Sequence, residues 1–293
     1  MRFSGSYVAL VTPFNADGSV NFDKLRELTA WHLEQGTDGI VVLGTTGESS
    51  TMSHEEDDDV ARCVIETVNG KIPVICGAGS NSTQTQLEKS RRYHEMGADG
   101  LLLITPYYNK ANDEGMYRHF ATMADAVDTP VILYNVPGRT GCAISPACCA
   151  RLAKHPNIAG IKEASGNISY AAQIARLIGD DFCMLSGNDD MIVPMMSLGA
   201  SGVISVWANI CPKQSHDLVA AFQAGDVAKA REIQLKYLEL INALFCEVNP
   251  IPVKVAMRKL GYAAGPLRMP LSEMEPEHEK QLETALRNHG LIK

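Results

Sequence analysis

The chain has 293 residues, a formal net charge of −8, and 45% hydrophobic against 20% charged residues. This length and apolar content provide for a sizeable core, which excludes disorder for the bulk of the chain. The sequence contains no basic block, so we expect no nucleic-acid partner and no membrane surface, because either would need grouped Lys and Arg to meet phosphate charge. We expect a small-molecule ligand instead.

The eight cysteines include no pair at the two-residue separation that zinc knuckles and thiol redox motifs use. No pair of histidines has metal-site spacing either, so we predict no metal site. We interpret the cysteines as reduced packing residues of a cytoplasmic protein, and only the adjacent Cys148 and Cys149 stand out. The longest uncharged stretch, residues 191–212, contains Pro and Gly breakers, which favour a buried helix, a turn and a strand over a membrane span.

Short runs of β-branched and other apolar residues recur along the chain up to Asn209. They predict eight strands, at residues 7–11, 39–43, 73–76, 100–104, 130–134, 159–162, 182–185 and 202–206. The segments between them have helical spacing and are long enough for crossover helices, so the sheet should be parallel. Eight such units, spaced by about 20 to 34 residues, match a (β/α)8 TIM barrel. A doubly wound open sheet is the alternative, and the lack of a Gly-rich dinucleotide turn disfavours it.

Three of these strands follow turns of one kind. The turns are Gly36-Thr37-Asp38-Gly39, Gly97-Ala98-Asp99-Gly100 and Gly199-Ala200-Ser201-Gly202. The first Gly of each suits the left-handed residue after a helix, and the second opens the strand without a Cβ.

After Asn209 the strand signals stop and four helices are predicted, at residues 212–224, 226–247, 251–260 and 272–288. The first of them can close the barrel. We therefore predict a barrel over residues 1–224 and a C-terminal helical extension over residues 225–293.

In a barrel of this type the active site lies where the strands end at their carboxyl side. Polar side chains follow strands two, four, five and six, at residues 44–48, 105–109, 134–141 and 162–167. Lys162 is the strongest signal among them, because it continues an apolar strand directly. One interpretation is a lysine that snorkels to solvent or pairs with a carboxylate such as Glu163. The other is a desolvated amine that attacks a carbonyl and forms a Schiff base.

Other residues near these strand ends suit the same chemistry. Tyr134 and Tyr108 offer phenols that, with Thr46, are able to relay a proton, although each tyrosine alone is more typical of packing. The hydroxyls and backbone N–H groups of Thr45 and Thr46 suit a carboxylate. Arg139 lies in a turn after strand five, where its planar fork suits bidentate capture of a second carboxylate.

Four motifs together closely resemble the dihydrodipicolinate synthase family, over essentially the whole chain. They are Gly44-Thr45-Thr46-Gly47-Glu48-Ser49, Tyr134-Asn135-Val136-Pro137-Gly138-Arg139-Thr140, Gly160-Ile161-Lys162-Glu163-Ala164-Ser165-Gly166 and Ser186-Gly187-Asn188-Asp189-Asp190. The first and third mark the wider class of Lys-dependent pyruvate aldolases, which includes N-acetylneuraminate lyase. The Gly-Arg-Thr turn marks the synthase.

The resemblance implies a lyase of lysine and diaminopimelate biosynthesis that condenses pyruvate, as an imine on Lys162, with L-aspartate 4-semialdehyde. Thr45 and Thr46 would hold the pyruvate carboxylate. Tyr134 would pass protons through Thr45, the residue to which the family pattern assigns the relay, and through Tyr108 of a neighbouring subunit. The resemblance also implies a homotetramer built from tight dimers, and no metal or organic cofactor. The remaining residues that it implicates are Arg139 on the semialdehyde carboxylate, and Gly187 and Ile204 along the pyruvate site.

The resemblance further implies a feedback site for lysine, of which four residues are present: Ser49, His54, Asn81 and Tyr107. The chain departs from the lysine-inhibited pattern at Asp57, where a His is usual, and at Thr85, where a Glu is usual. We therefore expect weak or no inhibition by L-lysine.

Two alternatives remain open at the level of sequence. One is N-acetylneuraminate lyase or another 2-keto-acid aldolase activity. The other is a non-catalytic barrel that binds a keto acid without turnover, which would have no need for a buried amine and a proton relay.

Overall fold

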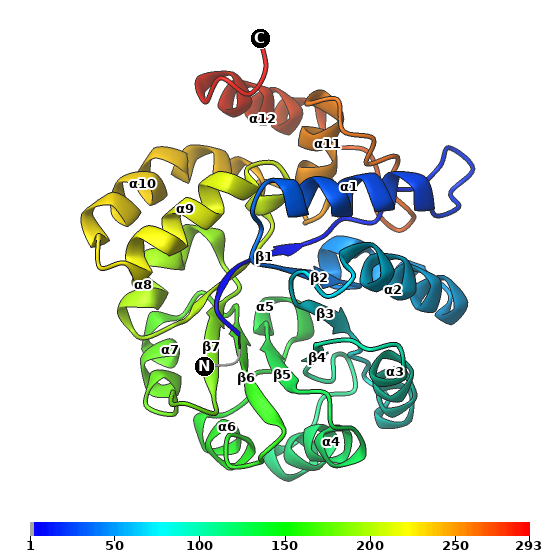
Figure 1. The fold of residues 1–293 in the computed structure, drawn as a ribbon, viewed down its shortest axis with the longest axis vertical. Helices are drawn as coiled ribbons and strands as arrows, with labels where there is room; N and C mark the ends of the chain where they lie inside the picture. Colours follow the sequence, from blue (N-terminus) through cyan, green and yellow to red (C-terminus); the bar gives the residue numbers. More distant parts are fainter. Residues whose placement is uncertain (1–2) are drawn as a thin grey trace. The chain divides into compact units, whose positions relative to one another are not determined.

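The computed structural model describes residues 3–293. Within them, eight parallel strands follow one another in chain order, from β1 to β8, and form a closed barrel (Figure 1). Each strand is followed by at least one helix, and further helices follow the last βα unit. The (β/α)8 barrel with C-terminal helices that the sequence predicts is confirmed.

All eight strands lie within a few residues of their predicted positions. They are β1 (Gly5–Ala9), β2 (Gly39–Val42), β3 (Val74–Gly77), β4 (Gly100–Ile104), β5 (Val131–Asn135), β6 (Ile158–Glu163), β7 (Cys183–Ser186) and β8 (Gly202–Ser205). The helices are α1 (Phe22–Glu34), α2 (His54–Val68), α3 (Thr83–Glu95), α4 (Asp113–Ala126), α5 (Pro137–Thr140), α6 (Pro146–Leu152), α7 (Ile168–Ala175), α8 (Ile192–Ser197), α9 (Pro212–Gln223), α10 (Val227–Ala243), α11 (Ile251–Lys259) and α12 (Pro276–Asn288).

Two helix ends differ from their predictions. The helix predicted over residues 226–247 ends at Ala243, and the one predicted over residues 272–288 begins only at Pro276. Proline at the first helical position explains the second difference, because its fixed φ favours a helix start and its missing N–H needs no partner there. The uncharged stretch at residues 191–212 forms a helix, a turn and a strand, as predicted. In the described part of the chain, no helix is both long and apolar enough to cross a membrane.

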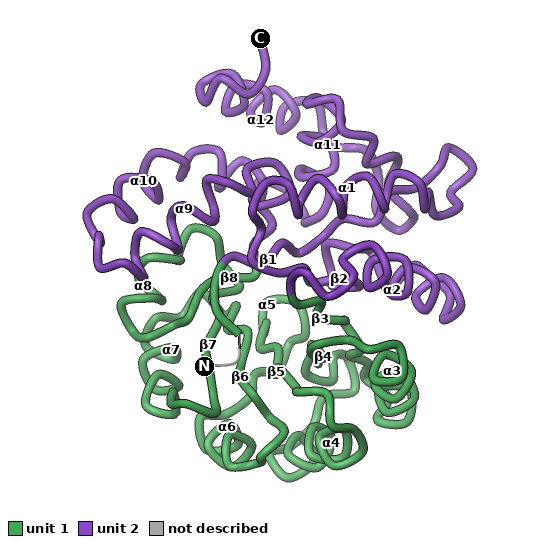
Figure 2. Tube along the Cα trace, viewed as in Figure 1, with its two compact units in different colours: residues 1–5, 73–204 green, residues 6–72, 205–293 purple. Residues whose placement is uncertain are grey.

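The chain divides into two compact units (Figure 2). Unit 1 comprises the residues up to Gly5 together with residues 73–204, and unit 2 comprises residues 6–72 and 205–293. The predicted boundary after residue 224 falls inside unit 2, between α9 and α10, which pack against each other. The division into a barrel over residues 1–224 and an extension over residues 225–293 therefore stays a prediction, and it differs from the division into compact units.

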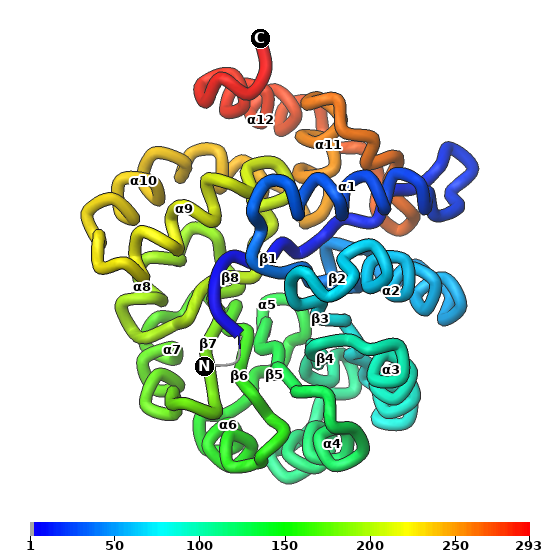
Figure 3. The backbone as a smooth tube through the Cα atoms, in the orientation of Figure 1, coloured from blue at the N-terminus to red at the C-terminus, as the bar shows by residue number. Residues whose placement is uncertain are grey.

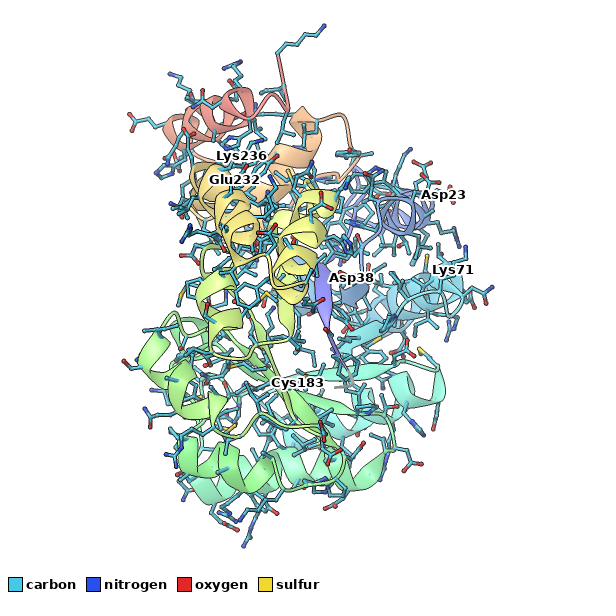
Figure 4. All side chains as sticks on the ribbon, turned by 60° about the vertical axis from the view of Figure 1, so that its left-hand side comes forward. Asp23, Asp38, Lys71, Cys183, Glu232 and Lys236 are labelled. Atoms are coloured by element: carbon cyan, nitrogen blue, oxygen red, sulfur yellow. The ribbon has the colours of Figure 1, made fainter. Side chains whose placement is uncertain are left out.

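Unit 1 is built on the ladder that runs from β3 to β8, in which each strand pairs in parallel with the next. Every residue of β3, β5, β6, β7 and β8 is buried, as expected for a parallel sheet covered on both faces. Outside the ladder, α3 packs on α4, α4 on α6 and α6 on α7. Cys183, labelled in Figure 4, lies on β7 within this core.

Unit 2 combines residues 6–72 with the C-terminal residues 205–293. In Figure 3 the α1 segment, in blue, runs beside the C-terminal segment, in orange. The rings of Trp31 on α1 and Tyr262 after α11 lie 4.8 Å apart between centroids, which is an ordinary aromatic contact. Within the same unit, β1 pairs with β2 and α10 packs on α9 and α12. The ring contact thus joins the segment after α11 to α1, the helix of the first βα unit.

The cysteines are all free within residues 3–293, and six of the eight are buried. Cys148 and Cys149 lie on α6, and burial raises the pKa of the Cys148 thiol to about 11 and that of Cys149 to about 12. Thiols with such pKa values are protonated near neutral pH and make poor nucleophiles. The prediction that the cysteines are packing residues is therefore confirmed for the buried six.

The three glycine-flanked turns have the predicted backbone. Their first glycines, at positions 36, 97 and 199, have φ values of 76°, 86° and 96°. A Cβ on Gly39 would lie 2.1 Å from the ring of Tyr7 and one on Gly202 would lie 1.9 Å from the Gly5 carbonyl oxygen, and both are overlaps. A Cβ on Gly100 would make a tight contact, 3.0 Å from the ring of Phe3. In the first of these turns, the Asp side chain has a role that the sequence did not reveal. Asp38, labelled in Figure 4, accepts a hydrogen bond from Ser6 N at 2.7 Å and thereby fixes the start of β1.

The first of these turns allows a test of the packing account. Gly39→Ala should lower the free energy of unfolding by about 3 kcal/mol, because the new methyl group must displace a buried ring. Gly36→Ala should cost only about 1 kcal/mol, the penalty for a left-handed residue with open space around it. Urea unfolding of the two variants measures both values. Equal losses would contradict the account.

Candidate active site

Lys162 lies near the end of β6 inside unit 1, with only 7% of its surface exposed. Its Nζ lies 4.4 Å from the centroid of the Tyr134 ring, and the two residues are register partners across β5 and β6. Within residues 3–293 no carboxylate forms an ion pair with Lys162. The alternative of a pair with Glu163 is wrong, because that carboxylate is taken by other donors.

An irregularity in the β5–β6 ladder sets this pairing. Val131 pairs with Ile158, but the register then shifts by one residue, so that Ile132 pairs with Gly160 and Tyr134 with Lys162. Side chains alternate between the two faces of a strand, and a shift of one residue therefore moves a side chain to the other face. The shift is what brings Lys162, rather than Ile161, opposite Tyr134.

A buried polar network holds the strand ends beside this pair. Asn135 Nδ2 donates to Glu163 Oε2 at 2.7 Å, and Ser165 N donates to Glu163 Oε1 at 2.7 Å. The Asn135 Oδ1 in turn accepts from Ile144 N at 3.0 Å. Burial raises the pKa of the Glu163 carboxyl, and the hydrogen bonds from Ser165 and Asn135 oppose that rise. The network fixes the residues next to Tyr134 and Lys162, and sequence analysis did not single it out.

Gly187, after β7, leaves room beside the lysine. A Cβ at this position would lie 3.0 Å from Lys162 Cε and 2.5 Å from the Ala164 Cβ. Such an atom would crowd the aliphatic stem of the lysine, so the glycine keeps space around the amine. Ile204, on β8, is fully buried within the same unit. These are the two positions that the sequence resemblance places along a small keto-acid site.

Arg139 lies on α5, the short helix that follows β5 directly. Its residue is exposed, in contrast to Tyr134 five residues earlier. Arg139 therefore lies at the surface, whereas Lys162 is buried. Its exposed position suits contact with a second substrate.

Tyr107 and Tyr108 follow β4 and are exposed. Tyr108 is 92% exposed and has a left-handed backbone with φ of 68°, which is uncommon for a non-glycine residue. A hydrogen bond connects this loop to the loop after β3, because Asn109 Nδ2 donates to the Asn81 carbonyl oxygen at 2.9 Å. The exposed side chain of Tyr108 therefore contacts little of its own chain.

Thr45 and Thr46 lie in unit 2, in a 3-10 turn (Thr45–Gly47) after β2. Leu43 and Glu48, on either side of this turn, have φ values of 61° and 55°, which are strained for residues with side chains. Thr46 is buried, and its Oγ1 accepts a hydrogen bond from Asn249 Nδ2 at 3.0 Å. Thr45 is partly exposed. The turn therefore presents one accessible hydroxyl and one that a C-terminal residue holds.

A buried ion pair lies at the end of the same turn. Lys254 Nζ is 2.7 Å from Glu48 Oε1, with both side chains fully buried. The ammonium also donates to the carbonyl oxygens of Thr12 and Pro266, at 3.0 and 2.7 Å, so all of its hydrogens are used. Burial lowers the pKa of Lys254 to about 8, and the Glu48 carboxylate opposes that effect. A lysine whose donors are all taken is a structural clamp, unlike Lys162.

The residues of the expected lysine site belong to different units. Ser49 and His54 lie in unit 2, where His54 begins α2 and is exposed, whereas Asn81 and Tyr107 lie in unit 1. Asp57 is buried on α2, and Thr85 lies in the first turn of α3. Among the residues that the structure describes, no group of three or more His, Cys, Asp or Glu is placed to hold a metal ion.

Comparison with known proteins agrees with this geometry. The model of the dihydrodipicolinate synthetase family matches residues 2–289. The chain is 50% identical to the 4-hydroxy-tetrahydrodipicolinate synthase of Clostridium perfringens (strain SM101 / Type A), over 99% of this chain and 100% of the relative. A dihydrodipicolinate synthase from Acinetobacter baumannii, solved in complex with pyruvate, gives a TM-score of 0.96 at 44% identity, over 99% of both chains. The enzyme from Cyanidioschyzon merolae, solved with lysine bound, gives 0.96 at 40% identity, also over 99% of both.

The match extends over almost the whole chain, in sequence and in structure. It therefore includes the buried Lys162 with Tyr134, the threonine turn and the C-terminal helices alike. The chain belongs to the dihydrodipicolinate synthetase family.

Proposed function

We propose that the chain is a lyase that condenses pyruvate with L-aspartate 4-semialdehyde to give 4-hydroxy-tetrahydrodipicolinate, in the biosynthesis of diaminopimelate and lysine. The observation that carries this proposal is the Lys162 amine, buried in a barrel strand against the Tyr134 ring with no carboxylate paired to it among the described residues. Relatives at 50% identity with the synthase activity support the choice of reaction.

The reaction begins when the neutral Lys162 amine attacks the C2 carbonyl of pyruvate, and loss of water gives an imine. The imine withdraws electrons, so that a methyl proton leaves and an enamine forms. The enamine carbon then attacks the aldehyde carbon of the semialdehyde, whose oxygen takes up a proton. Finally, the amino group of the semialdehyde attacks the imine carbon, closes the ring and releases Lys162. One water is lost overall, and no electrons enter or leave.

Each candidate residue has a role in this sequence. Thr45 and Thr46 hold the pyruvate carboxylate, Gly187 and Ile204 line the pyruvate site, and Arg139 binds the semialdehyde carboxylate. Tyr134 passes protons to and from the reacting carbons, relayed through Thr45. The contact of the Tyr134 ring with Lys162 supports its assignment, and the partial exposure of Thr45 supports a hydroxyl open to solvent.

Tyr108 completes the relay in a second copy of the chain. Its 92% exposure supports this assignment, because a displayed phenol on a fixed loop is available to a neighbouring subunit. The enzyme then works as a dimer at least, and we propose a homotetramer of two such tight dimers.

The proposed chemistry uses no separate cofactor, since the imine on Lys162 itself accepts electrons from the reacting carbon. A cytoplasmic location fits the eight free cysteines of the described chain, because thiols persist in reducing compartments.

The alternative activity, cleavage of N-acetylneuraminate or of another 2-keto-acid aldol, uses the same imine. Turnover of aspartate semialdehyde against sialic acid distinguishes the two, and a barrel that only binds keto acids turns over neither.

Borohydride reduction in the presence of pyruvate should add a reduced three-carbon unit to Lys162, detected by peptide mass spectrometry. Lys162→Ala should lose the adduct and all turnover, and Lys162→Arg should not restore them, because a guanidinium provides no neutral nucleophile. Lys71→Ala, which removes an exposed lysine labelled in Figure 4, serves as the control and should label normally. An unchanged adduct in Lys162→Ala would reject the assignment.

Arg139→Ala should impair the use of the semialdehyde and leave imine formation with pyruvate largely intact. Loss of a charged, bidentate contact should cost about 2 to 3 kcal/mol of transition-state stabilisation, roughly 30- to 150-fold in kcat/KM. Separate measurement of pyruvate trapping and of steady-state turnover tests this. If trapping falls as far as turnover, Arg139 supports the fold of the site instead.

L-Lysine should inhibit the enzyme weakly or not at all. Thr85 offers a neutral hydroxyl where the inhibited pattern has a Glu to pair with an ammonium group, a loss of about 1 to 2 kcal/mol or roughly one decade in affinity. Asp57 adds a carboxylate, but this residue is buried. Titration of lysine into a steady-state assay decides the question, and half-inhibition below about 1 mM, an affinity near 4 kcal/mol, would show that Asp57 compensates.

A further inference from the structure

The hydrogen bond between Asn249 and Thr46 joins residues that are 203 positions apart in the chain. Asn249 Nδ2 donates to Thr46 Oγ1 at 3.0 Å, and the two residues are 6% and 3% exposed. Asn249 lies just before α11, in the C-terminal part of unit 2. Buried side-chain amides and hydroxyls are held by such bonds because water cannot replace them.

This bond determines which way the Thr46 hydroxyl faces. A hydroxyl has one hydrogen to donate, and when an amide N–H occupies one of its lone pairs, that hydrogen is left to point at another acceptor. We propose that Asn249 is a positioning residue, which fixes the Thr46 hydroxyl as a hydrogen-bond donor to the carboxylate of the keto-acid substrate. The inference rests on the proposed function, because it needs that carboxylate to be the acceptor.

The surrounding contacts support a prearranged turn. Glu48, which follows the turn in the left-handed conformation, is held by Lys254 at one carboxylate oxygen and by Arg268 N at the other, at 2.7 and 2.9 Å. These two partners and Asn249 all come from the C-terminal segment at residues 249–268. The segment therefore fixes the backbone of the turn through Glu48 and the direction of its hydroxyl through Asn249. Donors that are oriented before the substrate arrives cost no reorganisation when they bind it.

Asp at position 249 has nearly the shape of Asn but the opposite hydrogen-bonding polarity. A carboxylate only accepts, so it would take the Thr46 hydrogen and add a negative charge near the substrate anion. Ala at position 249 would remove the amide donor and leave the hydroxyl free to rotate. Asn249→Asp thus tests the effect of turning the Thr46 hydrogen away from the substrate. Asn249→Ala tests the effect of losing the contact that orients the hydroxyl.

The test measures pyruvate KM, semialdehyde KM, kcat and the pyruvate dependence of borohydride trapping for Asn249→Asp and Asn249→Ala. Asn249→Asp should raise the pyruvate KM about tenfold or more, the effect of losing a hydrogen bond to a charged group, and Asn249→Ala should raise it several-fold. The semialdehyde KM should change less than twofold in both. The control is Asn21→Asp, at the N-cap of α1 in the same unit, where Asp caps as well as Asn.

A cycle with Thr46→Val shows whether Asn249 acts through the hydroxyl. Asn249→Ala should have no further effect on the pyruvate KM when Thr46 is already Val. A pyruvate KM within twofold of the wild type in Asn249→Asp would overturn the inference, as would an undiminished effect of Asn249→Ala in the Thr46→Val background. Thermal unfolding checks that Asn249→Asp is folded. If it is not, Asn249→Ala, alone and in the Thr46→Val background, tests the inference. Failure of the wild type to trap pyruvate would instead reject the proposed function.

Discussion

The site depends on the burial of one amine that has no carboxylate partner among residues 3–293. Lys162 is 7% exposed on a strand of unit 1, and its Nζ faces the ring of Tyr134. An ammonium group in such surroundings has lost much of its hydration, and the face of an aromatic ring returns only about 0.5 to 2 kcal/mol of that cost. A leucine would stabilise the strand better. The nucleophilic role proposed for Lys162 accounts for a lysine at this position, and the contact with Tyr134 keeps the amine in place.

Two of the three lysines that are buried within residues 3–293, Lys162 and Lys254, show the contrast. Lys254 has a carboxylate at 2.7 Å and two carbonyl oxygens, so its amine is saturated and its position fixed. Breaking such a pair leaves a buried charge and typically costs about 3 to 5 kcal/mol, although a buried pair adds little stability over apolar residues. Its role is to define one conformation, here the strained turn that ends at Glu48. Lys254 thus stabilises the shape of the turn, whereas Lys162 forms no ion pair within residues 3–293 and suits the proposed reaction.

Much of this arrangement was predictable from sequence. The strand–helix alternation, the glycine-flanked turns and the placement of Lys162 all depend on patterns within a few residues. The contacts that orient the site do not. Asn249 meets Thr46 only because the fold brings residues 203 positions apart together, and Asn249 carries no local signal. The one-residue shift between β5 and β6, which sets Lys162 against Tyr134, is likewise a property of strand pairing that apolar runs do not encode.

A crystal structure of the chain soaked with pyruvate tests the central claim most directly. The account predicts continuous electron density from Lys162 Nζ to the C2 atom of pyruvate, with a carboxylate oxygen within hydrogen-bond distance of Thr46 Oγ1. Pyruvate bound without a covalent bond to Lys162, or attached to a different lysine, would contradict it.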